Sequence, residues 1–347
     1  MTISQGQNPF DTMDYLVDCA KRAGATGIAA SRFFDFDQQA EQLSGFGQEY
    51  LQLSPGAFEG RFLSVEFGRE VSLHVEYANR SLAQSMTAPT NLVSLGFVLG
   101  STPYRANGET LDHEGVLLVP PGAELHFHSP EGASIVALCV STEVLEATGL
   151  FADITCFSTG KPAVVIDAPN FVARARQDIV DSLRRASVHP KPEVLGRILA
   201  ASLLTNLRVE MALRTDMSAT SAQTRKLENF VRTIDLFKSQ THEPMTYDLL
   251  TACTGASRRS LQSSFRDVVG CGPFEYRRQM RLCAARGKIA NRGEMRHTIA
   301  DIAAEVGFFD LSHFSRAYRR LFSESPSQTR HRFTLGARPD DLSVFPK

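Results

Sequence analysis

The chain has 347 residues, more than a single hydrophobic core usually supports, so its length favours two domains. Hydrophobic residues make up 43% of the sequence but never run to 18 in a row, which argues against a disordered chain and against membrane-spanning helices. The net charge of −1 conceals an asymmetry, because residues 1–224 carry 16 Lys and Arg against 25 Asp and Glu, whereas residues 225–332 carry 19 against 11. The basic part is therefore suited to bind a polyanion.

Catalytic and metal-binding motifs are missing from the sequence. None of the six cysteines forms a C-x-x-C pair, and there is no Walker motif, no G-x-S-x-G and no G-x-G-x-x-G. We therefore expect no catalytic residues, no metal and no cofactor. No basic start followed by an apolar stretch opens the chain, so we expect a cytoplasmic protein without a membrane partner.

After a possible short helix at residues 10–17, short apolar runs alternate with Gly, Pro and Asn as far as residue 166, which is typical of strands and turns. The predicted strands are Arg61–Phe67, Val71–Tyr77, Leu92–Leu99, Gly115–Val119, Ala123–His128, Ser134–Val140 and Ala163–Ile166. This pattern predicts a β-barrel or a β-sandwich. From polarity and strand position, the residues expected to line a ligand pocket are Phe67, His74, Tyr77, Phe97, Arg105 and His126.

Glu124, His126 and His128 share one face of a predicted strand, because alternate residues of a strand point the same way. The pattern resembles the metal motif of enzymatic cupins, although the spacing to the carboxylate is short. Three interpretations stay open: a metal site, the lining of an effector pocket, or an ordinary strand, which we favour. A cupin-type metal enzyme fused to a helical module is accordingly the alternative function.

Two helices are predicted next, from a cap at Asn170 to about residue 186 and from Pro192 to about residue 213. This hairpin can pack on its own domain or pair with a second copy of the chain, and we favour a homodimer contact. The following segment, TDMSATSAQ, is small and polar and predicts a linker. The expected domains are residues 1–214 for effector binding and dimerisation, a linker at 215–224, and residues 225–335 for DNA binding.

Residues 246–332 contain one pattern twice. The first copy, TYDLLTACTGASRRSLQSSFRDVVGCGPFEYRR, begins at Thr246, and the second, TIADIAAEVGFFDLSHFSRAYRRLFSESPSQTRHR, begins at Thr298. Glycines at Gly255 and Gly307 permit the positive φ of a tight turn. The matched pairs are Thr246 with Thr298, Leu250 with Ile302, Ala252 with Ala304, Gly255 with Gly307, Ser257 with Asp310, Leu261 with Phe314, Phe265 with Tyr318, Pro273 with Pro326 and Arg277 with Arg330. The repeat predicts two helix-turn-helix units.

Local signals indicate where the helices of these units begin. Thr246 and Ser257 are suited to cap the two helices of the first copy, because a hydroxyl oxygen can accept from the free amides of the first turn. Thr298 with Asp301 fits a capping box, and Asp310 is suited to cap the next helix. The side chains expected to be buried are Leu249, Leu250, Cys253, Leu261, Phe265 and Val268 in the first copy, and Ile302, Ala303, Val306, Phe314, Ala317, Tyr318 and Leu321 in the second.

Polar and basic side chains fall on the outer face of the second helix in each copy, where they are suited to phosphates and base edges. They are Arg258, Arg259, Gln262, Ser263 and Arg266, and then Leu311, Ser312, Ser315, Arg316, Arg319 and Arg320. Two ordinary hairpins with solvated arginines are the plainer alternative, which the matched pair argues against. Residues 273 to about 291 predict a connecting helix of about 28 Å, near the ~34 Å between successive major grooves.

Residues 227 to about 333 resemble the DNA-binding domain of the AraC/XylS family of bacterial transcription regulators. The resemblance is carried by IADIAAEVGF, SHFSRAYRRLF, SPSQTR, and RRSLQSSFRDVVG followed by GPFEYRRQMRL. By position it implies base contacts from Arg259, Gln262, Ser263, Leu311, Ser312, Ser315 and Arg316. The chain departs from the family at Leu311, where a polar residue is frequent and a thymine methyl contact is an alternative, and at Ser263, where many members have Arg.

The same resemblance implies an α+β protein. Its N-terminal part would be a cupin-like β-barrel with a helical hairpin, followed by an all-α domain with two helix-turn-helix units joined by a helix. We expect an activator that binds double-stranded promoter DNA, RNA polymerase and a small-molecule effector, and that forms a homodimer. The segment QEYLQLSPGAFEG is similar to the subgroup that includes ethanolamine-utilisation regulators. A regulator controlled by a partner protein is a further alternative.

Overall fold

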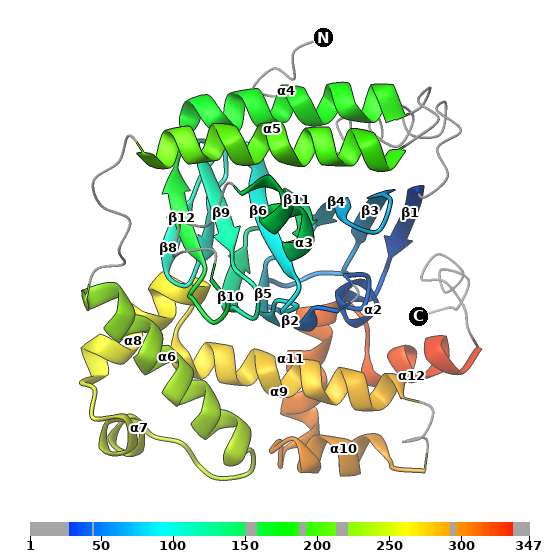
Figure 1. Ribbon diagram of the computed structural model, residues 1–347. Coiled ribbons are helices and arrows are strands. Elements are labelled where there is room, and N and C mark those ends of the chain that lie inside the picture. The colour runs from blue at the N-terminus through cyan, green and yellow to red at the C-terminus, as the bar shows by residue number, and fades with distance from the viewer. Residues whose placement is uncertain are drawn as a thin grey trace.

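The computed structural model describes residues 28–43, 45–149, 158–186, 192–212, 221–291 and 296–335. The helix predicted at residues 10–17 and most of the predicted linker lie outside these ranges. In Figure 1, two sheets occupy the middle of the molecule, a pair of long helices lies across one side of them, and a helical domain lies on the other side. This is the predicted α+β arrangement, with the strands first in the chain and the helical domain last.

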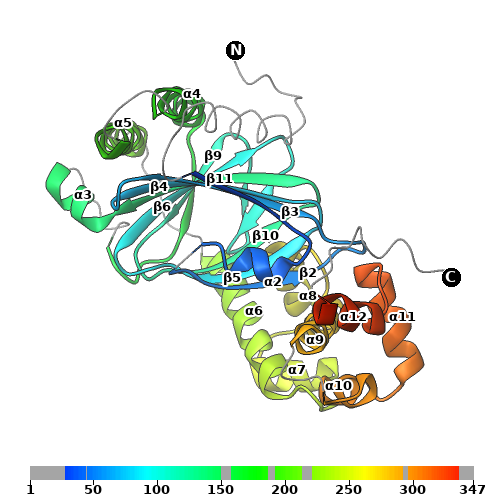
Figure 2. The ribbon, with the colours of Figure 1, turned by 90° about the vertical axis from the view of Figure 1, so that its right-hand side faces the viewer.

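The strands form one sheet of seven and one of five, in the orders β1-β3-β4-β11-β6-β9-β12 and β2-β5-β10-β7-β8. All their pairings are antiparallel. Their bounds are β1 Ile28–Phe33, β2 Gly47–Gln52, β3 Gly60–Phe67, β4 Val71–Ala78, β5 Leu82–Thr87, β6 Leu92–Leu99, β7 Tyr104–Ala106, β8 Glu109–Leu111, β9 Gly115–Val119, β10 Glu124–Ser129, β11 Ala133–Ser141 and β12 Val164–Asp167. Figure 2 shows the sheets nearly edge-on, one above the other.

The seven predicted strands are confirmed, with ends that differ by at most one residue, and the sequence pattern missed β1, β2, β5, β7 and β8. Four of those five belong to the five-stranded sheet. Strand β2 lacks a clear apolar alternation because its face that is directed at the other sheet carries Gln48 and Tyr50. A strand whose inner face is polar gives no hydrophobic period of two.

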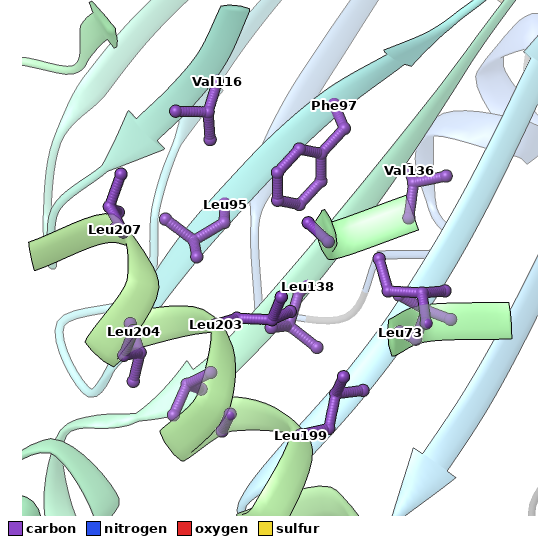
Figure 3. Packing of buried hydrophobic residues seen from close by; sticks show 14 of the residues in the cluster. Leu73, Leu95, Phe97, Val116, Val136, Leu138, Leu199, Leu203, Leu204 and Leu207 are labelled. Carbon is purple, nitrogen blue, oxygen red and sulfur yellow. The ribbon is translucent and has the colours of Figure 1, made fainter. Parts of the chain in front are cut away.

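A core lies between the seven-stranded sheet and the helices α4 (Pro169–Ala186) and α5 (Pro192–Ala212). Figure 3 shows Leu199 and Leu203 of α5 directed toward Leu73 and Leu138 of the sheet. The predicted hairpin is therefore present and packs on its own domain. Its first helix begins at Pro169, so Asn170 lies inside the helix and is not the predicted cap.

The remaining helices are short α2 and α3 beside the sheets and α6 to α12 in the C-terminal domain. Their bounds are α2 Phe36–Ala40, α3 Thr142–Thr148, α6 Ser221–Ser239, α7 Tyr247–Thr254, α8 Arg258–Val269, α9 Pro273–Ala290, α10 Ile299–Glu305, α11 Leu311–Phe322 and α12 Pro326–Leu335. Helix α6 thus begins inside the segment predicted as linker. Within the described ranges, no helix combines the length and the apolar composition needed to cross a membrane.

The five-stranded sheet packs directly on the C-terminal domain, a contact that the sequence did not predict. Buried Ala83 of β5 and half-buried Leu51 of β2 pack with Phe230 and Phe265 of the helices. Figure 2 shows the same arrangement, with α8 and α9 below β2, β5 and β10. The outer face of this sheet is therefore an interface between the two domains rather than a solvated surface.

Candidate nucleic-acid interface

The first helix-turn-helix unit consists of α7 and α8, and its predicted caps are confirmed. The Thr246 hydroxyl accepts a hydrogen bond from the Leu249 amide, and the Ser257 hydroxyl accepts one from the Ser260 amide. Between the helices, Gly255 has a φ of +72°, the left-handed conformation that glycine adopts without strain. Each of the two helices thus begins at a side chain that satisfies free amides of its first turn.

The buried face of α7 differs from the prediction. Leu250 is fully buried as expected, but Cys253 is exposed and Thr254 is buried in its place. Burial of Thr254 is tolerated because its hydroxyl donates a 2.6 Å hydrogen bond to the Leu250 carbonyl, which leaves its methyl group to pack. On α8 the prediction is confirmed, with Leu261, Phe265 and Val268 fully buried.

The second unit consists of α10 and α11 and follows the same plan. Thr298 and Asp301 form both hydrogen bonds of a capping box. The Asp310 carboxylate accepts from the His313 amide at the start of α11, and this bond is the main cause of the lowered pKa of Asp310. The side chains that hold the unit together are buried as predicted at Ile302, Ala303, Val306, Phe314, Tyr318 and Leu321, and Ala317 is half-buried.

On the predicted outer face of α8, the arginines are exposed to solvent, and two of the residues contact Tyr247. Arg258, Arg259 and Arg266 are exposed, whereas Gln262 and Ser263 are half-buried. The Arg258 guanidinium lies 4.3 Å from the centre of the Tyr247 ring, and the Gln262 side chain donates to the Tyr247 hydroxyl at 3.1 Å. Sequence reasoning missed Tyr247, although an aromatic residue directly after the Thr246 cap was the available signal.

Ser263 is engaged within its own helix. Its hydroxyl donates a 3.2 Å hydrogen bond to the Asp267 carboxylate, and the same carboxylate lies 2.6 Å from the Lys226 ammonium of α6. A base contact from Ser263 would compete with this bond. The side chains of Ser263 and Gln262 are therefore both already hydrogen-bonded within the first unit.

All six predicted residues of α11 line its outer surface. Leu311, Ser312, Arg316, Arg319 and Arg320 are exposed, and Ser315 is half-buried. The three arginine side chains form no salt bridge and no hydrogen bond with any residue that the structure describes. They are thus available to phosphate oxygens and base edges.

Both recognition helices contact the five-stranded sheet through their C-terminal ends. In α8 the Asp267 carbonyl accepts from Arg105 of β7 at 3.2 Å, and in α11 the Leu321 carbonyl accepts from Gln52 of β2 at 2.9 Å. Their first turns, which carry Arg258, Arg259, Leu311 and Ser312, are exposed. The five-stranded sheet therefore holds the C-terminal end of each recognition helix and leaves its N-terminal first turn exposed.

Helix α9 joins the two units without a break. Its 18 residues give a length of about 27 Å. Arg277 on this helix donates to the carbonyls of Gln240 and Glu243, and Arg281 donates to the Thr241 carbonyl, so α9 also holds the loop after α6. The predicted connecting helix is confirmed as one continuous helix.

A cleft of about 390 Å³ lies between α9 and the start of α11. It is lined by Phe274, Arg277, Arg278, Arg281, Gly307, Phe308, Phe309, Asp310 and His313. Burial, and next the charge of Arg281, lower the pKa of Arg277 to about 10, yet the guanidinium stays charged at neutral pH. Sequence reasoning missed this cleft because it forms only when residues far apart in the chain meet.

The six residues predicted to line a ligand pocket do not converge on one cavity. Phe67, Tyr77 and Phe97 point to the α4–α5 side of the seven-stranded sheet, within its core. Arg105 and His126 point to the C-terminal domain, where His126 lies 5.4 Å from the Phe230 ring. Only His74 lies on the face of its strand that is directed at the other sheet. The prediction failed as a set because it did not resolve which face of each strand is inner.

Glu124, His126 and His128 do share one face of β10, as alternate residues must. That face is directed at the C-terminal domain: His128 packs against Gly270 at the end of α8, and its ring bonds to the Ser81 hydroxyl at 2.9 Å. Among the described residues, no cluster of three or more His, Cys, Asp and Glu is arranged to hold a metal ion. The interpretation of this strand as ordinary structure fits its contacts.

Residues 250–332 match the family model described as a helix-turn-helix domain. The transcriptional activator RhaR of Pectobacterium carotovorum subsp. carotovorum (strain PC1) is 30% identical over 154 residues, which are 44% of this chain and 52% of RhaR. The chain thus spans about half the length of the curated relatives it matches. RhaR of Escherichia coli (strain K12) is 29% identical over 161 residues, 46% of this chain and 55% of that protein.

A solved structure, described as a "probable AraC family transcriptional regulator" from Rhodopseudomonas palustris CGA009, is 30% identical to this chain. The match covers 30% of this chain and 96% of that one, with a TM-score of 0.28. An AraC-type regulator from Chromobacterium violaceum is 28% identical over 32% of this chain and 94% of its own, with a TM-score of 0.29. Through its two helix-turn-helix units, the chain belongs to the AraC family of transcription regulators.

Proposed function

We propose that this protein is a sequence-specific DNA-binding transcription regulator whose two recognition helices, α8 and α11, enter adjacent major grooves. The observation that carries the proposal is the pairing of two capped units by one unbroken helix of about 27 Å, close to the ~34 Å between successive grooves. Both first turns are exposed, and the residues around them are basic.

The proposed division of labour follows from exposure and from existing contacts. Arg259, Gln262, Ser312, Ser315 and Arg316 lie in the first two turns of their helices and would read base edges. Residues nearer the C-terminal ends, together with Arg258 on its aromatic support, would bind phosphates and supply most of the salt-dependent affinity; they are Arg266, Arg319 and Arg320. Ser263 and Leu311 are the remaining residues of the predicted DNA-contacting surface.

We further propose that a small polar effector binds between the two sheets. There, Glu76 of β4 is buried and accepts from Gln39 at 2.7 Å and from the Tyr50 hydroxyl at 2.8 Å. Burial raises the pKa of Glu76. Both amide atoms of Gln48 and the Nδ1 of His74 are buried without a hydrogen-bond partner, so these groups could act as donors and acceptors for a ligand.

A homodimer through α5 is supported by its outer surface. Val194, Ile198 and Val209 are exposed at 39%, 60% and 56%, and their spacing of four and eleven residues places them on one stripe of the helix. A second copy could cover this stripe by pairing α5 with α5.

An activator must also contact RNA polymerase, which we propose as a further partner. Because its target would be chromosomal DNA, we propose that the protein acts in the bacterial cytoplasm.

The proposal can be tested by mixing purified full-length protein with genomic fragments at near-physiological salt and sequencing those retained. We expect enrichment of a few promoter regions that share a two-part site. Arg316→Ala serves as the matched variant, because it removes an exposed side chain without touching the core. Uniform recovery of all fragments, with and without metabolite extract as a source of effector, would contradict sequence-specific binding.

A further inference from the structure

Large hydrophobic side chains are exposed in only two places within the described residues. One is the stripe on α5, and the other is the start of α11, where Phe309 is 81% exposed and Leu311 is 45% exposed. Single exposed hydrophobic residues are common on protein surfaces, but these two flank the capping residue Asp310 within three positions. They form an apolar tip on the second recognition helix.

The fold holds this tip outward. Phe308, the preceding residue, packs inward with its ring 5.3 Å from that of Phe314, which is fully buried. Asp310 fixes the first turn of α11 through its bond to the His313 amide at 2.9 Å. Phe309 is therefore presented by a turn that is anchored on both sides, rather than by a free loop.

The surroundings of the tip are suited to a polyanion. The adjoining cleft contains Arg277, Arg278 and Arg281, and none of these three forms a salt bridge with a residue in the described ranges. Arg277 is only 6% exposed, and its Nε is buried without a hydrogen-bond partner. The one carboxylate of the cleft, Asp310, is already occupied as a helix cap. An anionic partner is thus favoured over an apolar peptide or a second copy of the chain.

An apolar tip inside a cationic surface requires a polyanion that displays an apolar group. In the major groove of B-DNA, the only such group on a base edge is the 5-methyl of thymine. We propose that Phe309 and Leu311 contact thymine methyls, so that the half-site bound by α11 is specified through A·T pairs at one or two positions. This inference rests on the proposed DNA-binding function and adds Phe309 to the residues that determine specificity.

The two units should therefore read DNA by different chemistry. The exposed side chains at the start of α8 are Arg258 and Arg259, and α8 exposes no large hydrophobic residue. We expect hydrogen bonds to dominate in the first half-site, with methyl contacts restricted to the second. This asymmetry provides an internal control on one DNA duplex.

The test uses the operator recovered by selection, with deoxyuridine in place of thymine at one position at a time, which removes only the methyl group. Binding of the full-length protein is measured by fluorescence anisotropy. Loss of a buried methyl contact should weaken wild-type binding roughly fourfold at the contacted positions of the second half-site. Deoxyuridine in the first half-site should change binding less than twofold.

Phe309→Ser and Leu311→Gln are the informative variants, because both side chains are exposed and their loss leaves the core intact. Each should make the protein insensitive to deoxyuridine at its own position, while circular dichroism shows unchanged helix content. Equal sensitivity in wild type and in both variants, or no sensitive position in the second half-site, would overturn the inference while leaving the proposed function standing. Failure to recover any operator would instead overturn the proposed function.

Discussion

The guanidinium of Arg286, on the helix that connects the two DNA-reading units, lies 3.1 Å from the carboxylate of Asp35 in the barrel domain. Both side chains are buried, at 3% and 5% exposure. Burial opposes the charge of Arg286, but Asp35 and further acidic neighbours outweigh it and raise the pKa of Arg286. The ring of Phe36, next to Asp35, lies 4.8 Å from the same guanidinium.

This ion pair connects the β-sheet domain to the helix-turn-helix units. Asp35 caps the short helix α2, and Gln39 of that helix donates to Glu76 between the two sheets. A ligand that took over the hydrogen bonds of Glu76 would therefore act on α2 and, through Asp35, on Arg286. We propose this chain of contacts as the route by which an effector alters α9.

Removing the guanidinium of Arg286 should lower the stability of the folded protein. Arg286→Gln leaves Asp35 buried without its partner, which should lower the free energy of unfolding by about 3–5 kcal/mol. Urea unfolding measures this change. Lys288→Gln is the matched control on the same helix, because its 2.6 Å pair with Glu305 is solvent-accessible and should contribute little to stability. Equal losses in both variants would refute a structural role for the buried pair.

Two buried histidines should destabilise the folded protein in mild acid. Burial lowers the pKa of His74 to about 4, and burial together with Arg105 lowers the pKa of His128 to about 4, from an ordinary value of 6.5. The unfolded chain binds protons on these residues that the folded chain does not, so their stabilisation is present above pH 6.5 and is lost as the pH falls toward 4. Burial raises the pKa of Asp37 to about 7, which acts in the opposite direction across this window, so the contribution of a histidine is read from the difference between the wild type and a variant.

The variant His128→Gln isolates the contribution of the domain interface. It keeps a polar side chain of similar size but cannot be protonated, so its melting temperature should depend less on pH between 6.5 and 4 than that of the wild type. A pH profile that is the same in both proteins would show that His128 does not titrate with unfolding.

The two turn glycines, Gly255 and Gly307, should differ in how well they tolerate replacement by alanine. At Gly255 a Cβ would meet nothing within 4 Å, so Gly255→Ala should cost only the backbone strain of alanine at a φ of +72°, about 1–2 kcal/mol of stability. At Gly307 a Cβ would lie 2.8 Å from the Thr241 carbonyl oxygen and 2.9 Å from Arg281, so Gly307→Ala should destabilise the protein further. Thermal unfolding of the two variants checks the order, and a milder effect at Gly307 would contradict the packing of this turn.

Arg316 and Arg320 should have separable effects on DNA binding. Arg316→Ala, in the second turn of α11, should cost about 1–3 kcal/mol and relax preference at one base pair. Arg320→Ala, nearer the C-terminal end, should weaken binding to all sequences and reduce the salt slope by about one. Binding to a panel of single-base operator variants at several salt concentrations distinguishes the two, and identical profiles would contradict the division of roles.

The proposed dimer depends on the stripe of α5. Ile198→Asp places a charge at its most exposed position, so sedimentation velocity should show a dimer for the wild type and a monomer for the variant. A wild-type monomer at micromolar concentration would contradict the dimer.

The DNA-binding domain could be predicted from the sequence because its signals are local. Caps such as Thr298 with Asp301, the turn glycines and the spacing of Leu261, Phe265 and Val268 each lie within one unit, and repetition of the unit strengthened them. The main local error was Cys253, since its exposure depends on Thr254 satisfying its own hydroxyl within the helix.

The domain interface could not be predicted, because its residues are joined by the fold and not by sequence spacing. Gln52 and Leu321 are 269 residues apart, and a polar side chain on β2 gives no indication that it caps the end of a distant helix. The ligand set failed for a related reason: Tyr77 and Glu76 are neighbours in β4, yet only Glu76 is directed at the other sheet. An alternating strand shows that it has two faces without showing what each face contacts.

Operator spacing tests most directly whether one chain reads two adjacent major grooves across a rigid helix. Five base pairs, about half a helical turn, are inserted between the two halves of the selected operator, and binding is measured by anisotropy and footprinting. We predict that the wild type protects both halves of the intact operator and that affinity for the insertion falls to the level of a single half-site. Undiminished affinity for the inserted operator, or protection of one groove only, would contradict the account.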